Sequence, residues 1–145
     1  MKKLELKHLA PYLPYELKVQ TTSSNITKIR TVIIEEYGSD ELIGISHIMK
    51  YQIHNKPILR PLSDLTKEIE VNGEKFVPYI ELLRVCNFDV DNMSKKEIEN
   101  YNPNKEYGGA CPMSKMYVET AKLFEWHFDV FNLIEKGLAI DINTL

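Results

Sequence analysis

The sequence has little cysteine and no long apolar run, and both shortages restrict what the protein can be. Two cysteines occur among 145 residues, Cys86 and Cys111, and they do not form the closely spaced pair typical of zinc sites. No apolar stretch approaches the ~20 residues that a membrane-spanning helix needs. Charged residues interrupt the first eight positions, unlike the apolar core of a secretion signal. We therefore expect free thiols, no membrane partner and a cytoplasmic location.

Established motifs for catalysis and cofactor binding are missing as well. The chain contains no P-loop, no GxGxxG, no HExxH, no GxSxG and no calcium-binding loop. His47 and His54 could bind zinc with a cysteine or with His8, but structural zinc sites normally show two close ligand pairs. We therefore expect no metal and no cofactor.

Two weaker catalytic arrangements remain. His127 lies between Glu125 and Asp129, but residues two apart point to different sides of a helix and cannot converge on one site. Cys111 precedes a predicted helix, which can lower a thiol pKa but does not by itself create a nucleophile. These patterns favour binding over catalysis.

The composition predicts one globular α+β domain over residues 1–145, with a β-rich N-terminal half and a helical C-terminal half. Hydrophobic residues make up 43% of the chain and charged residues 27%, which is ordinary for a globular domain. Alternating and β-branched residues predict strands at 17–20, 26–37 and 42–54. We expect these strands to form a small antiparallel sheet or partial barrel over residues ~17–60.

Turn and capping signals organise the middle of the chain. Asn72-Gly73 predicts a tight turn, with a helix and a hairpin competing over residues 67–71. Pro78 suits the first turn of a helix that ends before Asn87. Residues 89–109 are polar and rich in asparagine, and we expect a loop there with one short helix near 94–97.

The C-terminal third predicts a long helix over residues ~112–136, followed by Gly137 and a short strand over 138–142. Apolar residues recur there at spacings of three and four, which indicates one broad buried face. Trp126, Phe128 and Phe131 contribute to this face. They are our candidates for an interface between copies of the chain in a homo-oligomer.

Positive charge is concentrated at the start of the chain. Residues 1–30 hold six Lys and Arg against two Glu, a charge of +4, so the whole-chain charge of −3 leaves −7 for the remainder. Clustered cations and aromatic rings are the groups that bind phosphates and bases. The candidates for ligand binding are Tyr12, Tyr15, Lys18, Lys28, Arg30 and Arg60.

Four segments together resemble a family of small uncharacterised proteins from Bacteroidota phages and prophages. They are LAPYLPY at 9–15, KPILRPLSDL at 56–65, EWHFDVF at 125–131 and IEKGLAIDI at 134–142. The resemblance implies an accessory role in the cytoplasm of the host cell, exerted by binding a host protein, a phage protein or a defence signal. The leading hypothesis is therefore a non-enzymatic phage binding protein. The alternative is a nucleic-acid or nucleotide binder that uses the basic N-terminal third.

Overall fold

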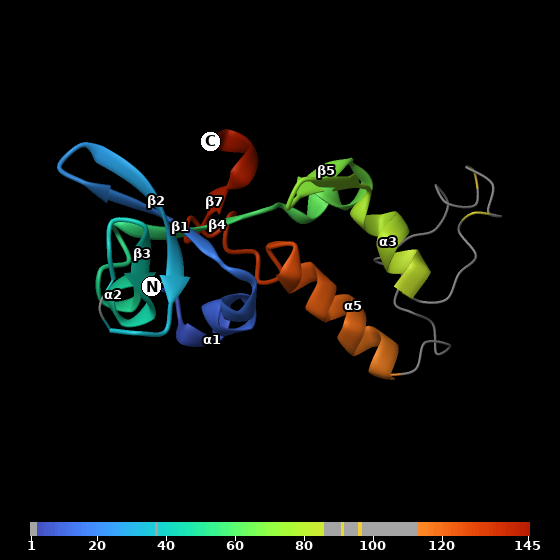
Figure 1. Ribbon diagram of the computed structural model, residues 1–145, viewed down its shortest axis with the longest axis horizontal. Coiled ribbons are helices and arrows are strands. Elements are labelled where there is room, and N and C mark those ends of the chain that lie inside the picture. The colour runs from blue at the N-terminus through green and yellow to red at the C-terminus, as the bar shows by residue number, and fades with distance from the viewer. Residues whose placement is uncertain (1–2, 37, 86–90, 92–95, 97–112) are drawn as a thin grey trace. The chain divides into compact units, whose positions relative to one another are not determined.

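The computed structural model describes residues 3–36, 38–85, 91, 96 and 113–145 (Figure 1). The chain divides into two compact units. We call residues 1–62 with 123–145 the sheet unit, and residues 63–122 the hairpin unit. The expectation of a single domain stays a prediction.

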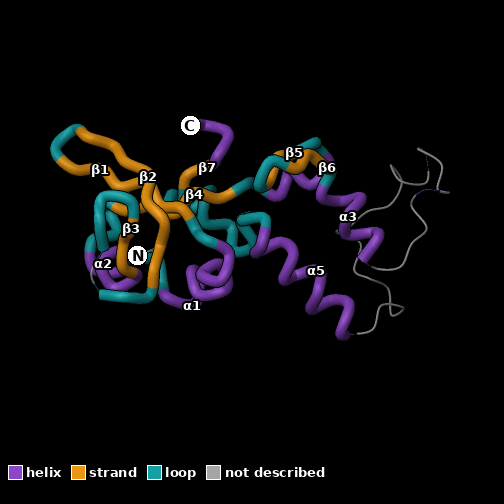
Figure 2. The backbone as a smooth tube through the Cα atoms, viewed as in Figure 1, coloured by secondary structure: helices purple, strands orange, loops and turns teal. Residues whose placement is uncertain are grey.

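A mixed five-stranded sheet forms the centre of the sheet unit, with the strand order β3-β2-β1-β4-β7 (Figure 2). The strands are β1 Lys18–Ser23, β2 Ile26–Ile33, β3 Leu42–Gly44, β4 Asn55–Leu59 and β7 Ile140–Asp141. β1 is antiparallel to β2 and β4, whereas β3 joins β2 and β7 joins β4 in parallel. Ser24 and Asn25 both have positive φ, 47° and 67°, which suits the two-residue turn between β1 and β2.

Short helices complete the sheet unit: α1 Leu6–Leu9, η1 Ala10–Tyr15, α2 Ile45–Lys50 and η4 Ile142–Thr144. The core contains buried side chains from the first helices, the strands and the C-terminal turns. Its fully buried members include Leu9, Tyr12, Leu17, Val19, Ile48, Leu59 and Leu133. Apolar residues from both ends of the chain therefore stabilise one core.

The hairpin unit begins within η2 Leu62–Thr66 and contains the hairpin of β5 Ile69–Val71 and β6 Glu74–Phe76, followed by α3 Pro78–Val85. Most of α5 Met113–Glu125 also belongs to it. Asn72 and Gly73 have φ of 52° and 84°, as the predicted tight turn requires. The predicted helix at Pro78 is confirmed, and the hairpin occupies residues 69–76.

The predicted antiparallel sheet over residues ~17–60 is wrong in its third strand. Residues 42–44 form β3, which runs parallel to β2, and residues 45–50 are the helix α2. The chain can turn from strand to helix at Gly44 because its backbone packs closely there. A Cβ at this position would lie 2.6 Å from the carbonyl oxygen of Glu35.

The predicted long helix over ~112–136 is also wrong, because α5 ends at Glu125. His127 and Asn132 have φ of 60° and 58°, a left-handed conformation that a right-handed helix cannot contain. Arg60 exchanges backbone hydrogen bonds with this segment, donating to His127 and accepting from Asp129, each at 2.8 Å. Turns therefore bury the apolar residues that resembled a helix face. The final strand is shorter than expected, at residues 140–141.

Two further findings concern the chain as a whole. Among the described helices, none has both the length and the apolar character that a bilayer-spanning segment needs. The loop expected at 89–109 lies outside the described residues, apart from positions 91 and 96.

Candidate functional site

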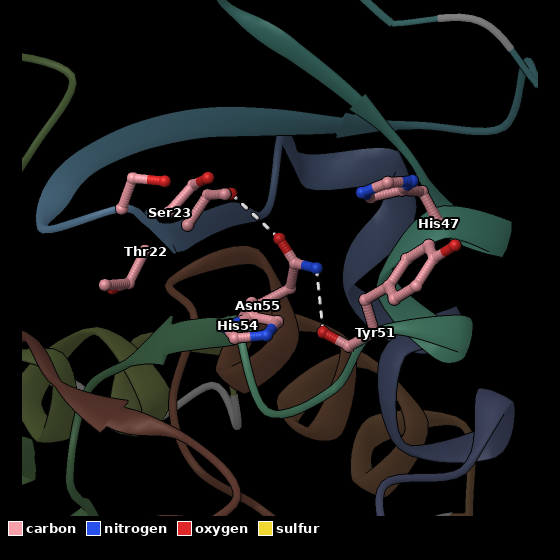
Figure 3. A pocket seen from close by; sticks show the side chains of 8 residues that line it. Thr22, Ser23, His47, Tyr51, His54 and Asn55 are labelled. Atoms are coloured by element: carbon pink, nitrogen blue, oxygen red, sulfur yellow. Dashed lines mark hydrogen bonds between the residues drawn. The ribbon is translucent and has the colours of Figure 1, made fainter.

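A pocket of about 430 Å³ lies in the sheet unit beside the β1–β2 turn, α2 and the start of β4 (Figure 3). We call it the hydroxyl–imidazole pocket. It is lined by Thr21, Thr22, Ser23, Ser24, His47, Tyr51, His54 and Asn55. These side chains offer four hydroxyls, two imidazoles, a phenol and an amide, and none carries a carboxylate. The lining suits a polar ligand and does not repel an anion.

The pairing of β1 with β4 brings the two sides of the pocket together. Thr21 lies opposite Asn55 in the antiparallel register, and its hydroxyl donates to the Asn55 Oδ1 at 3.0 Å. The backbone N–H of Thr22 donates to the His54 carbonyl at 2.8 Å. Segments thirty residues apart in the sequence therefore share one wall.

Asn55 determines the shape of the turn that carries Tyr51. The Asn55 side chain is 1% exposed, and its amide donates to the Tyr51 carbonyl at 2.8 Å (Figure 3). The same carbonyl accepts from the His54 backbone N–H at 3.1 Å. A buried amide whose donor and acceptor are both bonded holds its neighbours in one arrangement.

Two aromatic rings stand at one side of the pocket. His47 and Tyr51 are four residues apart at α2, and their ring centroids lie 4.7 Å apart at an interplanar angle of 49°. The Lys50 ammonium lies 5.3 Å from the Tyr51 ring centroid. Tyr51 is 43% exposed, so part of its ring is accessible to a flat ligand.

A second hollow of about 240 Å³ adjoins this pocket, because His47 lines both. We call it the Arg30 recess. It is lined by Arg30, Glu36, Gly38, Ser39, Leu42, Ile43, Gly44 and His47. Arg30 therefore lies next to the hydroxyl–imidazole pocket.

Of the predicted ligand-binding cations, Lys28 and Arg30 share one face of the sheet. Their partners in the β1–β2 register are Thr21 and Val19, and opposed residues of an antiparallel pair point to the same face. Thr21 on this face contributes to the pocket lining, as does Thr22 on the opposite face. Lys18 points to the opposite face, where its ammonium donates to the Thr31 hydroxyl.

Of the two predicted aromatic ligand residues, Tyr12 belongs to the buried core cluster. Tyr12 is fully buried, and its hydroxyl donates to the Phe128 carbonyl and accepts from the Val130 N–H at 3.3 Å. Burial raises the pKa of Tyr12, which keeps the hydroxyl protonated as this donor. The Tyr15 carbonyl accepts from the Nε2–H of His127 at 2.6 Å. Tyr12 is thus a residue of the core, and Tyr15 is joined to His127 through its backbone.

The residues predicted to form an interface lie beside the same cluster. Phe128 is fully buried, Trp126 is 8% exposed, and Phe131 is half-buried against His8 and Phe124. Arg60 joins this segment through the backbone bonds to its neighbours. Glu125, His127 and Asp129 were considered above as a catalytic arrangement. They do not converge on one site, because the Asp129 carboxylate accepts hydrogen bonds from backbone N–H groups instead.

The buried imidazole of His127 makes stability depend on pH. Burial lowers its pKa from the ordinary 6.5, although the bond to Tyr15 opposes this shift. Below pH 6.5 the unfolded chain therefore binds more protons than the folded chain, and stability falls as the pH falls toward the lower folded pKa. We expect His127→Asn, which tolerates the positive φ, to lose less stability than the wild type between pH 7.5 and 5.5. Urea unfolding at both pH values measures this, and equal losses would contradict it.

Sequence reasoning missed most of the pocket. It weighed His47 and His54 as zinc ligands, and the structure brings both to one lining. Within the described residues, no group of three or more His, Cys, Asp or Glu side chains could hold a metal ion. The run of four hydroxyl residues at 21–24 is a signal for a polar site, although its last two residues also suit the turn that the sequence predicts.

Comparison of the chain with protein-family models, curated protein sequences and solved structures gives no match. The function is therefore argued from the pocket itself.

Proposed function

We propose that the protein is a non-enzymatic binding protein that holds a small nucleoside-like ligand in the hydroxyl–imidazole pocket. The observation that carries the proposal is the lining: an accessible ring pair at one side and four hydroxyls at the other, without a carboxylate. The volume of about 430 Å³ lies within the ~300–1,000 Å³ typical of ligand pockets.

The two sides of the pocket match the two parts of a nucleoside. A base can stack on the accessible part of Tyr51 beside His47, and such stacking contributes ~1–3 kcal/mol per base. The hydroxyl groups of a sugar both donate and accept hydrogen bonds, and the hydroxyls of residues 21–24 can do the same. Asn55 is bonded to both sides, so the pocket is held in shape before the ligand enters.

The biological setting that we propose is an accessory role of a phage or prophage in its host cell. The resemblance of four segments to phage and prophage proteins supports this setting. Such a protein acts by binding its ligand without changing it chemically. A nucleotide signal of the host is a ligand that suits the chemistry of the pocket.

The test is titration of the ¹⁵N-labelled full chain with each of the four common ribonucleosides, followed by backbone amide shifts. We expect saturable shifts at Thr21, Thr22, Tyr51 and His54 with at least one of them. Tyr51→Ala removes the stacking surface and should weaken that binding by about tenfold or more.

Ile53→Ala is the matched control, because Ile53 is 86% exposed, lies between Tyr51 and His54 and does not line the pocket. Its affinity should equal that of the wild type. The proposal is wrong if no nucleoside shifts these amides, or if Tyr51→Ala binds as well as Ile53→Ala. Binding of oligonucleotides without binding of nucleosides would favour the nucleic-acid alternative instead.

A further inference from the structure

We infer that the Arg30 recess is a site for a phosphate group, so that the ligand of the adjoining pocket is a nucleotide. This inference deepens the proposed function and rests on it for the identity of the whole ligand. It starts from Arg30 itself, whose Nε is buried and makes no hydrogen bond within the part of the chain that the structure describes.

The Arg30 side chain as a whole is half-buried, so this nitrogen is shielded from water while the residue still lines the recess. A donor that is shielded from water without an acceptor destabilises the folded protein, and a ligand that supplies acceptors to the guanidinium offsets part of this loss. No ion pair joins Arg30 to a carboxylate among the described residues. Because the planar fork of an arginine matches two phosphate oxygens, a phosphate is the partner that best completes it.

The other polar groups of the recess can supply further donors. The Ser39 Oγ accepts from the backbone N–H of Glu41 at 3.3 Å, which leaves the hydroxyl proton for another acceptor. His47 offers a ring N–H at the boundary with the hydroxyl–imidazole pocket. Donors from three separate segments suit a tetrahedral group better than a planar carboxylate.

The backbone around the recess is closely packed. A Cβ on Gly38 would lie 2.3 Å from the Leu42 carbonyl oxygen, and one on Gly44 would meet Glu35. The backbone therefore approaches other parts of the backbone closely at these two glycines of the lining. Glu36 also lines the recess, but its side chain is exposed and water screens its charge.

The position of the recess determines how one ligand would span both hollows. His47 belongs to both linings, so a base beside Tyr51 and a phosphate beside Arg30 lie on either side of it. Lys28 adds a second cation on the same face, in a weak exposed pair with Asp40 at 3.5 Å. Lys28 does not line the recess, so we expect it to contribute only a general attraction for anions.

The experiment compares each ribonucleoside with its 5′-monophosphate by titration of the full chain. In the wild type we expect the monophosphate to bind about 10–100-fold more tightly, the range for charge-assisted hydrogen bonds. Arg30→Gln should remove this difference while changing nucleoside affinity by less than about twofold. Lys28→Gln is the control for charge alone, and it should retain most of the difference in affinity between monophosphate and nucleoside.

A second measurement does not depend on any variant. Sodium phosphate is titrated into the ¹⁵N-labelled wild type at constant ionic strength against sodium chloride, and the Nε–H resonance of Arg30 is followed. A saturable shift with phosphate alone supports the recess, even if nucleosides fail to bind and the pocket proposal falls. No shift, or equal binding of nucleoside and monophosphate, overturns the inference and leaves the nucleoside pocket to its own test.

Discussion

Replacing Asp129 with alanine is expected to lower the free energy of unfolding by about 3 kcal/mol. The Asp129 carboxylate is 4% exposed and accepts from the backbone N–H groups of Leu133 at 2.7 Å and Ile134 at 2.8 Å. Hydrogen bonds to charged groups contribute ~1.5–3 kcal/mol each, and the variant would leave both donors without an acceptor. Urea unfolding followed by circular dichroism gives the value.

Asp141→Ala is the control for this experiment. Asp141 also accepts from a backbone N–H, that of Asn143 at 2.8 Å, but the bond is exposed to water. Its loss should change the free energy of unfolding by less than about 1 kcal/mol, because water replaces the acceptor. A loss at Asp129 no larger than the one at Asp141 would show that the carboxylate does not hold the turn.

Phe128→Ala should produce the largest loss of stability, about 3–5 kcal/mol. The Phe128 side chain is fully buried in the sheet unit, and truncation of a core phenylalanine removes buried apolar area and leaves a cavity. Phe131 is half-buried, so Phe131→Ala should lose clearly less. The measurement is the urea midpoint of each variant at constant m-value.

The same variant distinguishes a core residue from an interface residue. If Phe128 lay in an interface between copies, its truncation would weaken association and change the stability of each copy little. Sedimentation of the variant and the wild type at matched concentration separates the two effects. A stable Phe128→Ala protein with reduced association would contradict the core position.

Several elements could be predicted because their signals are local. The hairpin at Asn72-Gly73 depends on two residues that accept positive φ, and the helix at Pro78 depends on a residue that is already in helical geometry. The β1–β2 hairpin likewise follows from β-branched residues on either side of a short polar turn. Each signal acts between neighbours, so the sequence alone contains it.

The end of α5 could not be predicted from spacing. Apolar residues at intervals of three and four indicate burial of one side, and the turns after Glu125 bury the same residues without a helix. Whether this segment forms a helix or turns depends on two residues. The Asp129 carboxylate holds the turn, and the Arg60 backbone forms hydrogen bonds with the residues on either side of Phe128. Arg60 is more than sixty residues away, beyond any local pattern.

The sequence by itself determined the local turns, the strand-forming segments of β1 and β2, and the placement of Lys28 and Arg30 on one face, since residues two apart on a strand point the same way. The tertiary structure alone decided the pocket. The β1–β4 pairing joins Thr21 to Asn55, and the parallel pairing of β2 with β3 directs the chain into α2, which carries His47. Such pairings depend on which distant strands bury their apolar faces together, and no short segment records that choice.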